Sequence, residues 1–263
     1  MRHCFYLLLC SCALATSCNS GANQANDPTT TETPAPDNRN SEGEMVEVHP
    51  VFHGSVVLTQ GDRTIFIDPY NGAERYTSFG DPDLVLITHT HPDHLDTATL
   101  SGLQLDAAEL VGPQAVMDAM SMNPFAERHT LANGESWTWE DVTITAVPAY
   151  NDPPKDNFHP KGKFNGYVIA IGGQRYYFSG DTEGVPEMRQ LDDIDVAFVC
   201  MNLPYTMDVE QAVSAVLDFA PDVVYPYHYR NQDGSKSDVE AFKKMVNEQN
   251  ENIDVILENW YPE

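Results

Sequence analysis

The sequence predicts a layered α/β protein in which helices cover two packed β-sheets. Three observations support this prediction. β-rich segments joined by short turns dominate the first part of the chain after residue 45, as expected for antiparallel hairpins. Apolar strands alternate with amphipathic helices toward the C-terminus, which is typical of strand–helix–strand units. Several strands end in His or Asp, so their polar ends can meet at one edge of the sheets.

The predicted strands are short and rich in β-branched and aromatic residues. Gly61-Asp62, Glu140-Asp141 and Gly172-Gly173 provide the turns of three hairpins. In chain order the predicted strands are Val46–Phe52, Val56–Thr59, Thr64–Ile67, Leu84–Thr88, Ser136–Trp139, Val142–Val147, Tyr167–Ile171, Arg175–Ser179, Val196–Cys200 and Val223–Tyr227. The last two are nearly continuous apolar runs, which indicates strands buried on both faces.

Two amphipathic helices are predicted in the last quarter of the chain. Asp208–Ala220 carries apolar residues at helical spacing, with Asp208 as its N-cap and Pro221 just past its end. Asp238–Gln249 has a similar pattern and is predicted to form a second helix on the surface.

The N-terminus has the pattern of a secretory signal. Arg2 and His3 precede an apolar run that is too short to span a membrane as a mature helix. The run ends at Ala15-Thr16-Ser17-Cys18, which resembles a bacterial lipoprotein signal in which the Cys becomes the lipidated first residue. We therefore expect a signal peptide over residues 1–17 and a cell-envelope lipoprotein anchored at Cys18. The alternatives are lipidation at Cys12 and an ordinary cleaved signal, which would give a secreted or periplasmic protein.

Residues 18–44 are predicted to be a lipidated Cys followed by a disordered tether. This segment is rich in Asn, Thr, Pro, Asp and Glu and has almost no large apolar side chain, so it cannot bury enough surface to fold. The folded domain is therefore expected over residues 45–263. The lipid anchor would be its one connection to a membrane.

Charge and cysteine usage exclude several classes of function. The formal net charge of -26 makes a nucleic acid or an anionic membrane face an unfavourable partner. Cys200 is the one cysteine after residue 18, so the folded domain can form no internal disulfide. Cys200 lies in an apolar strand and is predicted to be an inert core thiol.

The segment His89-Thr90-His91-Pro92-Asp93-His94 follows an apolar strand and carries the strongest chemical signal. Imidazole nitrogen and carboxylate oxygen bind zinc, and they bind iron or manganese in mixed sites. Asp68, Asp181 and His228 also follow predicted strands. A single Asp at such a place is usually a turn residue. Together with the His cluster, however, these positions predict a metal site at one edge of the sheets.

These segments resemble the metallo-β-lactamase superfamily. In chain order, the segments that carry the resemblance are Asp68, His89–His94, Ser179-Gly180-Asp181-Thr182 and Tyr225-Pro226-Tyr227-His228-Tyr229. His53-Gly54-Ser55 and Phe158–Gly162 are similar to segments of its branch of broad hydrolases, which has lactonase-like and phosphodiesterase-like members. The resemblance spans nearly the whole folded domain. It implies an αββα four-layer sandwich with a one- or two-metal site at the sheet edge.

The resemblance also implies a role for each residue. The implied ligands are His89 and His91 for the first metal, Asp93, His94 and His228 for the second, and Asp181 for both. Asp68 would accept a hydrogen bond from a ligand imidazole and fix its tautomer. Asp93 and Asp181 would be the catalytic carboxylates, which orient a metal-bound hydroxide or move its proton. The expected cofactor is one or two Zn²⁺, with Mn²⁺ and Fe as alternatives.

One position departs from the family pattern. The family places a further first-metal His just after a strand in the middle of the chain, and here Val147–Asn151 ends in Asn151, a poor zinc ligand. His159 follows in a Pro-rich loop and can substitute if that loop folds back. The sequence leaves open whether His159 or Asn151 completes the first site.

Two further residues have two interpretations each. His53 ends a strand before Gly54, so it either holds substrate in the cleft or makes a structural hydrogen bond. Tyr205 follows the strand that contains Cys200, and it either lines the pocket or packs at its rim.

The expected activity is hydrolysis of a small ester, lactone or phosphodiester. Two divalent cations, Asp93, Asp181 and one hydroxide sum to a positive charge, to which Lys161 and Lys163 would add. A small anionic substrate would then be attracted. The alternative is a non-catalytic envelope lipoprotein of the same fold that binds a metal or ligand, and a di-iron oxidoreductase ranks third. The oligomeric state is left open.

Overall fold

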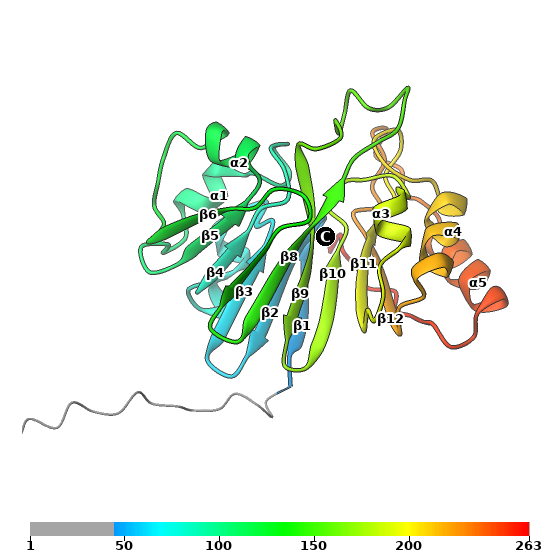
Figure 1. Ribbon diagram of the computed structural model, residues 1–263, viewed down its shortest axis with the longest axis horizontal. Coiled ribbons are helices and arrows are strands. Elements are labelled where there is room, and N and C mark those ends of the chain that lie inside the picture. Colours follow the sequence, from blue (N-terminus) through cyan, green and yellow to red (C-terminus); the bar gives the residue numbers. More distant parts are fainter. Residues whose placement is uncertain (1–44, 263) are drawn as a thin grey trace, which may run out of the picture. The chain divides into compact units, whose positions relative to one another are not determined.

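The computed structural model describes residues 45–262, and these residues form two mixed β-sheets that pack face to face (Figure 1). The predicted signal peptide, the lipidation site at Cys18 and the predicted tether lie outside the described residues.

The first sheet has six strands in the order of the sequence. They are β1 (Glu47–Phe52), β2 (Ser55–Gln60), β3 (Arg63–Ile67), β4 (Leu84–Leu86), β5 (Glu109–Gly112) and β6 (Glu127–Thr130). β1 to β3 are antiparallel, and β3 to β6 are parallel. Successive side chains alternate between two apolar layers: Ile65 and Ile67 pack in the larger core, and Phe66 packs in a second core on the other face.

The second sheet has seven strands in the order β13-β12-β11-β10-β9-β8-β7. They are β7 (Ser136–Trp139), β8 (Val142–Ala149), β9 (Phe164–Ile171), β10 (Gln174–Phe178), β11 (Val196–Cys200), β12 (Val223–Tyr227) and β13 (Asp254–Val255). β7 to β10 are antiparallel, and β10 to β13 are parallel. Each sheet therefore has one hairpin half and one parallel half.

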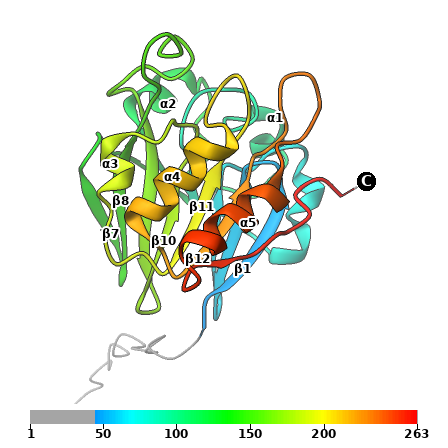
Figure 2. The same cartoon turned by 90° about the vertical axis from the view of Figure 1, so that its right-hand side faces the viewer.

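Helices cover the outer face of each sheet (Figure 1, Figure 2). The helices are α1 (Thr97–Ser101) and α2 (Gln114–Ala119) on the first sheet, and α3 (Pro186–Arg189), α4 (Val209–Phe219) and α5 (Val239–Gln249) on the second. Two 3₁₀ turns, η1 (Ala73–Arg75) and η2 (Thr77–Phe79), follow β3. These layers confirm the predicted αββα sandwich.

The two longest helices begin as the sequence predicts. The Asp208 carboxylate accepts a hydrogen bond from the Gln211 N–H at 2.8 Å, and Asp238 accepts one from the Ala241 N–H at 2.9 Å. Every strand predicted from the sequence is also present. The sequence did not predict β5, β6, β13 or α1 to α3. Among residues 45–262, no helix has the length and apolar character needed to cross a membrane.

The carboxyl ends of the central strands from both sheets meet at the same end of the sandwich. There, the Tyr167 hydroxyl on β9 donates a hydrogen bond of 2.9 Å to the Ile87 carbonyl after β4. The Asn165 N–H donates to the Thr88 carbonyl at 3.1 Å. These two bonds join the sheets directly beside the start of the His89–His94 loop.

We expect Tyr167→Phe to lower the free energy of unfolding by about 1–3 kcal/mol, because the buried Ile87 carbonyl loses its donor. Tyr177 is the matched control: it is equally buried in the same sheet, but its hydroxyl has no hydrogen-bond partner. Tyr177→Phe should therefore be neutral or stabilising. Urea denaturation measures both changes, and equal effects of the two substitutions would contradict this account.

Candidate metal centre

The carboxylate of Asp181 lies between two groups of histidine side chains. Asp181 follows β10 and has only 4% of its surface exposed. Its Oδ2 atom faces His89 and His159, and its Oδ1 atom faces His94 and His228. The structure therefore gives Asp181 the bridging position that the resemblance implied.

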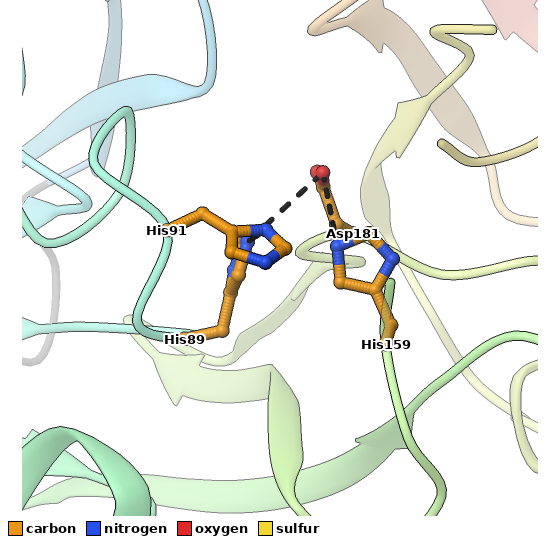
Figure 3. A group of neighbouring side chains, drawn as sticks. All are labelled: His89, His91, His159 and Asp181. Carbon is orange, nitrogen blue, oxygen red and sulfur yellow. Dashed lines mark hydrogen bonds and ion pairs between the residues drawn. The ribbon is translucent and has the colours of Figure 1, made fainter. Parts of the chain in front are cut away.

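The first group consists of His89, His91, His159 and one oxygen of Asp181 (Figure 3). The Asp181 Oδ2 atom lies 3.5 Å from His159 Nε2 and 4.0 Å from His89 Nε2. His89 Nε2 and His91 Nδ1 are 3.1 Å apart. Two nitrogens on one tetrahedral Zn²⁺ lie ~3.3 Å apart, given Zn–N bonds of about 2.0–2.1 Å. The spacing of these four side chains therefore suits a single cation.

The second group consists of His94, His228 and the other oxygen of Asp181. The Asp181 Oδ1 atom lies 3.5 Å from His94 Nε2 and 3.4 Å from His228 Nε2, and the two nitrogens are 3.0 Å apart. Asp93 adds an oxygen 3.4 Å from His228 Nε2. All the ligands that the resemblance implied are thus brought together in two adjacent groups.

Unpartnered polar atoms show that these residues fit a cation. His159 is fully buried, yet neither ring nitrogen has a hydrogen-bond partner, and Asp181 Oδ1 also has none. A buried polar group without a partner costs about 1–3 kcal/mol. A divalent ion bound to these atoms would supply the missing interaction. The set of three imidazoles and one carboxylate is suited to Zn²⁺, Fe or Mn²⁺.

The electrostatic surroundings keep the first group in the protonation state that metal binding requires. Burial lowers the pKa of His159 to about 4 and the pKa of His89 well below its usual value. Burial alone would raise the pKa of Asp181. The nearby His228, His94 and His159 lower this pKa by a larger amount, so the net shift is downward. Neutral imidazoles and an ionised carboxylate are the forms that bind a metal.

A buried network built on Asp68 orients His94. The two Asp68 oxygens accept hydrogen bonds from the Thr88 N–H at 2.7 Å, the Thr88 hydroxyl at 2.6 Å and His94 Nδ1–H at 2.7 Å. His94 Nδ1 is therefore the protonated nitrogen, and Nε2 points toward Asp181. Burial lowers the pKa of His94, but Asp181, Asp68 and Asp93 outweigh it and raise that pKa to about 10. Asp68 thus makes the hydrogen bond to the imidazole of a candidate ligand that the resemblance implied.

A second hydrogen-bond chain runs from the C-terminal segment to Asp93. The Tyr261 hydroxyl accepts from the Arg230 N–H at 3.0 Å and lies 2.9 Å from His53 Nδ1, to which it donates. His53 Nε2–H then donates to Asp93 Oδ2 at 3.1 Å. Burial and His228 lower the pKa of His53 to about 4, against the opposing effect of Asp93. His53 is therefore neutral and makes a structural hydrogen bond while also lining the cleft.

The structure places His159, and not Asn151, in the first group. Asn151 does not point its oxygen at the first group; its amide nitrogen donates to the Tyr205 carbonyl at 2.6 Å and to the Lys155 carbonyl at 3.3 Å. The Asn151 N–H donates to the His159 carbonyl at 2.9 Å. Asn151 thus closes the loop that carries His159 back to the metal centre, where the family pattern has a His ligand.

Unusual backbone conformations accompany the site. His53, Asp68 and His228 have φ values of 59°, 44° and 48°, a left-handed region in which each non-glycine residue costs about 1–3 kcal/mol. Gly180 has φ of 57°, and a Cβ there would lie 3.0 Å from the Asn165 carbonyl oxygen. Glycine before Asp181 therefore permits both the turn and the close approach of β9.

The candidate ligands lie beside a cavity of about 520 Å³. Its lining includes His91, Asp93, Asp181 and His228 from the metal centre, and Tyr205, as one of the two sequence-based interpretations expected. Further lining residues include Phe52, Tyr70, Phe158 and Arg230. Of these four, the sequence did not predict Phe158 and Arg230.

Lys161 and Lys163 do not line this cavity, although both were expected to add to its positive charge. The Lys161 ammonium pairs with Glu187 at 3.1 Å and donates to the Tyr150 hydroxyl at 2.8 Å. Lys163 lies over the ring of Phe164 and lines a different cavity. Burial is the main cause that lowers the pKa of His91, and the positive charge of Lys163 lowers it further, so Lys163 acts on the first group from outside the cavity.

Comparisons with known proteins agree with this geometry. Residues 63–229 match the β-lactamase superfamily domain. A UPF0173 metal-dependent hydrolase of Thermus thermophilus is 29% identical over 216 residues, covering 78% of this chain and 92% of the relative. The crystal structure of a candidate metal-dependent hydrolase from Parabacteroides distasonis has a TM-score of 0.72 and 36% identity, covering 82% and 93%. Igni18, a metallo hydrolase from Ignicoccus hospitalis, has a TM-score of 0.67 and 25% identity, covering 81% and 95%.

Metal content should depend on these residues in a graded way. We expect about two divalent ions per chain in the wild type, as in other two-metal sites. His159→Ala should lose the ion of the first group, and Asp181→Ala should lose both, because Asp181 faces both groups. Elemental analysis after desalting measures this, with His49→Ala, which lies outside every candidate metal-binding group of the described residues, as the control. Undiminished metal in Asp181→Ala would contradict the assignment.

Asp68→Asn should weaken metal binding about 10- to 100-fold, as expected when a partner of a ligand imidazole is lost. Asp68 accepts hydrogen bonds from Thr88 and His94. The side-chain amide of Asn would turn an NH₂ group toward at least one of these donors, so the tautomer of His94 would no longer be fixed. Asp83→Asn is the matched control, because Asp83 accepts the Thr64 N–H in the same sheet. Competition with a chromogenic chelator measures both affinities, and equal affinities would exclude an orienting role for Asp68.

Proposed function

The chain belongs to the metallo-β-lactamase superfamily and is a metal-dependent hydrolase, and we propose that it acts on a small ester, lactone or phosphodiester. The observation that carries this proposal is the position of Asp181 between two groups of ligands. A carboxylate shared in this way suits two cations about 3.5–4 Å apart, the arrangement of two-metal hydrolases. We propose Zn²⁺ as the metal, with Mn²⁺ and Fe as alternatives.

The chain's own groups favour attack by water over attack by a side chain. Cys200 is buried, and burial together with Asp181 raises the pKa of its thiol to about 12, so it cannot serve as a nucleophile at neutral pH. Divalent cations held by the two groups would lower the pKa of a water molecule and polarise the substrate oxygen. This chemistry requires no covalent intermediate on the protein.

Asp93 is placed to orient the attacking water. It lines the cavity, and a third of its side chain is exposed, whereas Asp181 is buried. Burial raises the pKa of Asp93, but His94, His228 and His53 lower it far more. Asp93 therefore stays ionised and can accept a hydrogen bond from water, while His53 holds the carboxylate in place. We propose Asp93 and Asp181 as the catalytic carboxylates.

The size of the cavity and the net charge favour a small substrate. A cavity of about 520 Å³ is within the range of small-molecule sites, roughly 300–1,000 Å³. The net charge of -26 would repel a polyanion such as nucleic acid.

We also propose that the protein is an exported lipoprotein anchored at Cys18, because the N-terminus has the pattern of a lipoprotein signal. This anchor would place the activity in the cell envelope.

A substrate panel tests the proposed activity. The purified protein is assayed with 4-nitrophenyl acetate, δ-valerolactone and bis(4-nitrophenyl) phosphate, each in the presence of Zn²⁺ or Mn²⁺. We expect turnover in at least one class that EDTA abolishes, that Asp181→Ala lowers by at least about 100-fold because it removes the shared ligand, and that His49→Ala leaves unchanged. Cleavage of nucleic acid alone, or no turnover with either metal, would refute the proposal.

A further inference from the structure

We propose that Arg230 binds a carboxylate or phosphate group of the substrate at the side of the metal centre. This inference rests on the proposed function and adds to it the class of small molecule that the cavity selects. Arg230 lies two residues after His228 and lines the same cavity as Asp93 and Asp181. Among the described residues that line this cavity, it is the one with a permanent positive charge.

Two aromatic rings pack against the Arg230 side chain and leave the N–H groups of its guanidinium without hydrogen bonds to the described residues. The guanidinium carbon lies 4.0 Å from the centroid of the Tyr261 ring and 5.5 Å from that of Phe52. A guanidinium stacked on an aromatic face keeps its N–H groups at the edge, where they match the two oxygens of a carboxylate or phosphate. The backbone N–H of Arg230 also donates to Tyr261, so main chain and side chain are anchored by the same residue.

The charge of Arg230 is unpaired within residues 45–262. No carboxylate of these residues forms an ion pair with it, and its guanidinium makes no hydrogen bond to them. Two arginines elsewhere in the described residues do form such ion pairs: Arg63 with Glu140 and Asp141, and Arg189 with Asp218. In a chain with 40 acidic and 14 basic residues, an arginine that faces a cavity and has no acidic partner is available to an external anion.

The rest of the lining indicates the other half of the ligand. Phe158 and Tyr205 pack edge to face, with centroids 5.1 Å apart, and both line the cavity. Such rings favour an apolar or aromatic body. The cavity thus combines the guanidinium of Arg230, the aromatic rings of Phe158 and Tyr205, and the metal centre. A small anion with an apolar body satisfies all three, whereas a neutral ester leaves Arg230 without a partner.

Binding of simple probes tests this inference without relying on turnover. The purified, metal-loaded protein is titrated calorimetrically with benzoate, phenylphosphonate and benzamide, which share a ring and differ in charge. We expect Arg230→Gln to weaken binding of benzoate, phenylphosphonate or both by about tenfold or more, as for a lost charge-assisted hydrogen bond. Benzamide binding should change less than about twofold, because a neutral amide loses no charged partner. Arg230→Lys should restore part of the anion affinity, because it keeps the charge but loses the planar fork.

Lys236→Gln is the matched control. Lys236 lies over the same Tyr261 ring, with its ammonium 5.0 Å from the centroid, and its removal changes the net charge equally, but it does not line the cavity. Lys236→Gln should leave all three affinities unchanged, and metal content and circular dichroism confirm that each variant is intact. Anion affinities that are equal in wild type and Arg230→Gln, or lowered equally by both substitutions, would overturn the inference. So would a wild-type protein that binds neither anion.

A kinetic comparison separates this inference from the proposed function. The ratio of kcat/KM for mono(4-nitrophenyl) succinate to that for 4-nitrophenyl acetate should fall about tenfold or more in Arg230→Gln, because only the first ester carries a carboxylate. An unchanged ratio would contradict the inference while leaving the hydrolase activity standing. Conversely, Arg230-dependent anion binding without hydrolysis of any substrate would leave the anion site standing and refute the proposed substrate class.

Discussion

The structure depends on one buried carboxylate that two sets of imidazoles share. Asp181 lies under the cavity with one oxygen toward each set, and burial alone would favour its neutral form. His228, His94 and His159 reverse that preference, so the buried carboxylate stays ionised beside His159, whose ring nitrogens have no hydrogen-bond partner in the described part of the chain. Without bound cations, burying these charged and polar groups costs free energy, and cations bound to them would offset that cost. The surrounding features, from the Asp68 network to the left-handed backbone at His53 and His228, hold the rings in this arrangement.

The sequence predicts the strands and the His or Asp residues that follow them. β4 ends before Thr88 and His89, β10 before Asp181, and β12 before His228. Parallel strands bring such positions to one edge of a sheet, and two sheets packed face to face bring both edges together. The candidate ligands other than His159 were therefore predictable from strand ends and from the family resemblance, and the predicted strands and both long helices are present. The hydrogen bonds between Tyr167 and Ile87 and between Asn165 and Thr88 show how the two edges are kept in register.

The features that the sequence did not predict depend on contacts between distant parts of the chain. β5 and β6 are four residues each and contain charged residues, so no periodic pattern distinguishes them from loops; pairing with β4 makes them strands. Asn151 lies where the family pattern has a ligand, but its side chain instead donates a hydrogen bond to the Tyr205 carbonyl. This bond helps to fix the loop that carries His159. Arg230 and Tyr261 act together from segments 31 residues apart, and neither has a motif of its own.

Asp181 joins two candidate cation positions beside one cavity. The most direct measurement is a crystal structure of the protein grown with Mn²⁺, with anomalous difference maps collected at the manganese edge. A bridging role for Asp181 requires two peaks about 3.5–4 Å apart, as in other two-metal sites. One peak should lie on each side of the Asp181 carboxylate, with His159 bound to one and His94 to the other. A single peak bound by histidines from both groups, or peaks that leave Asp181 without a contact, would contradict it.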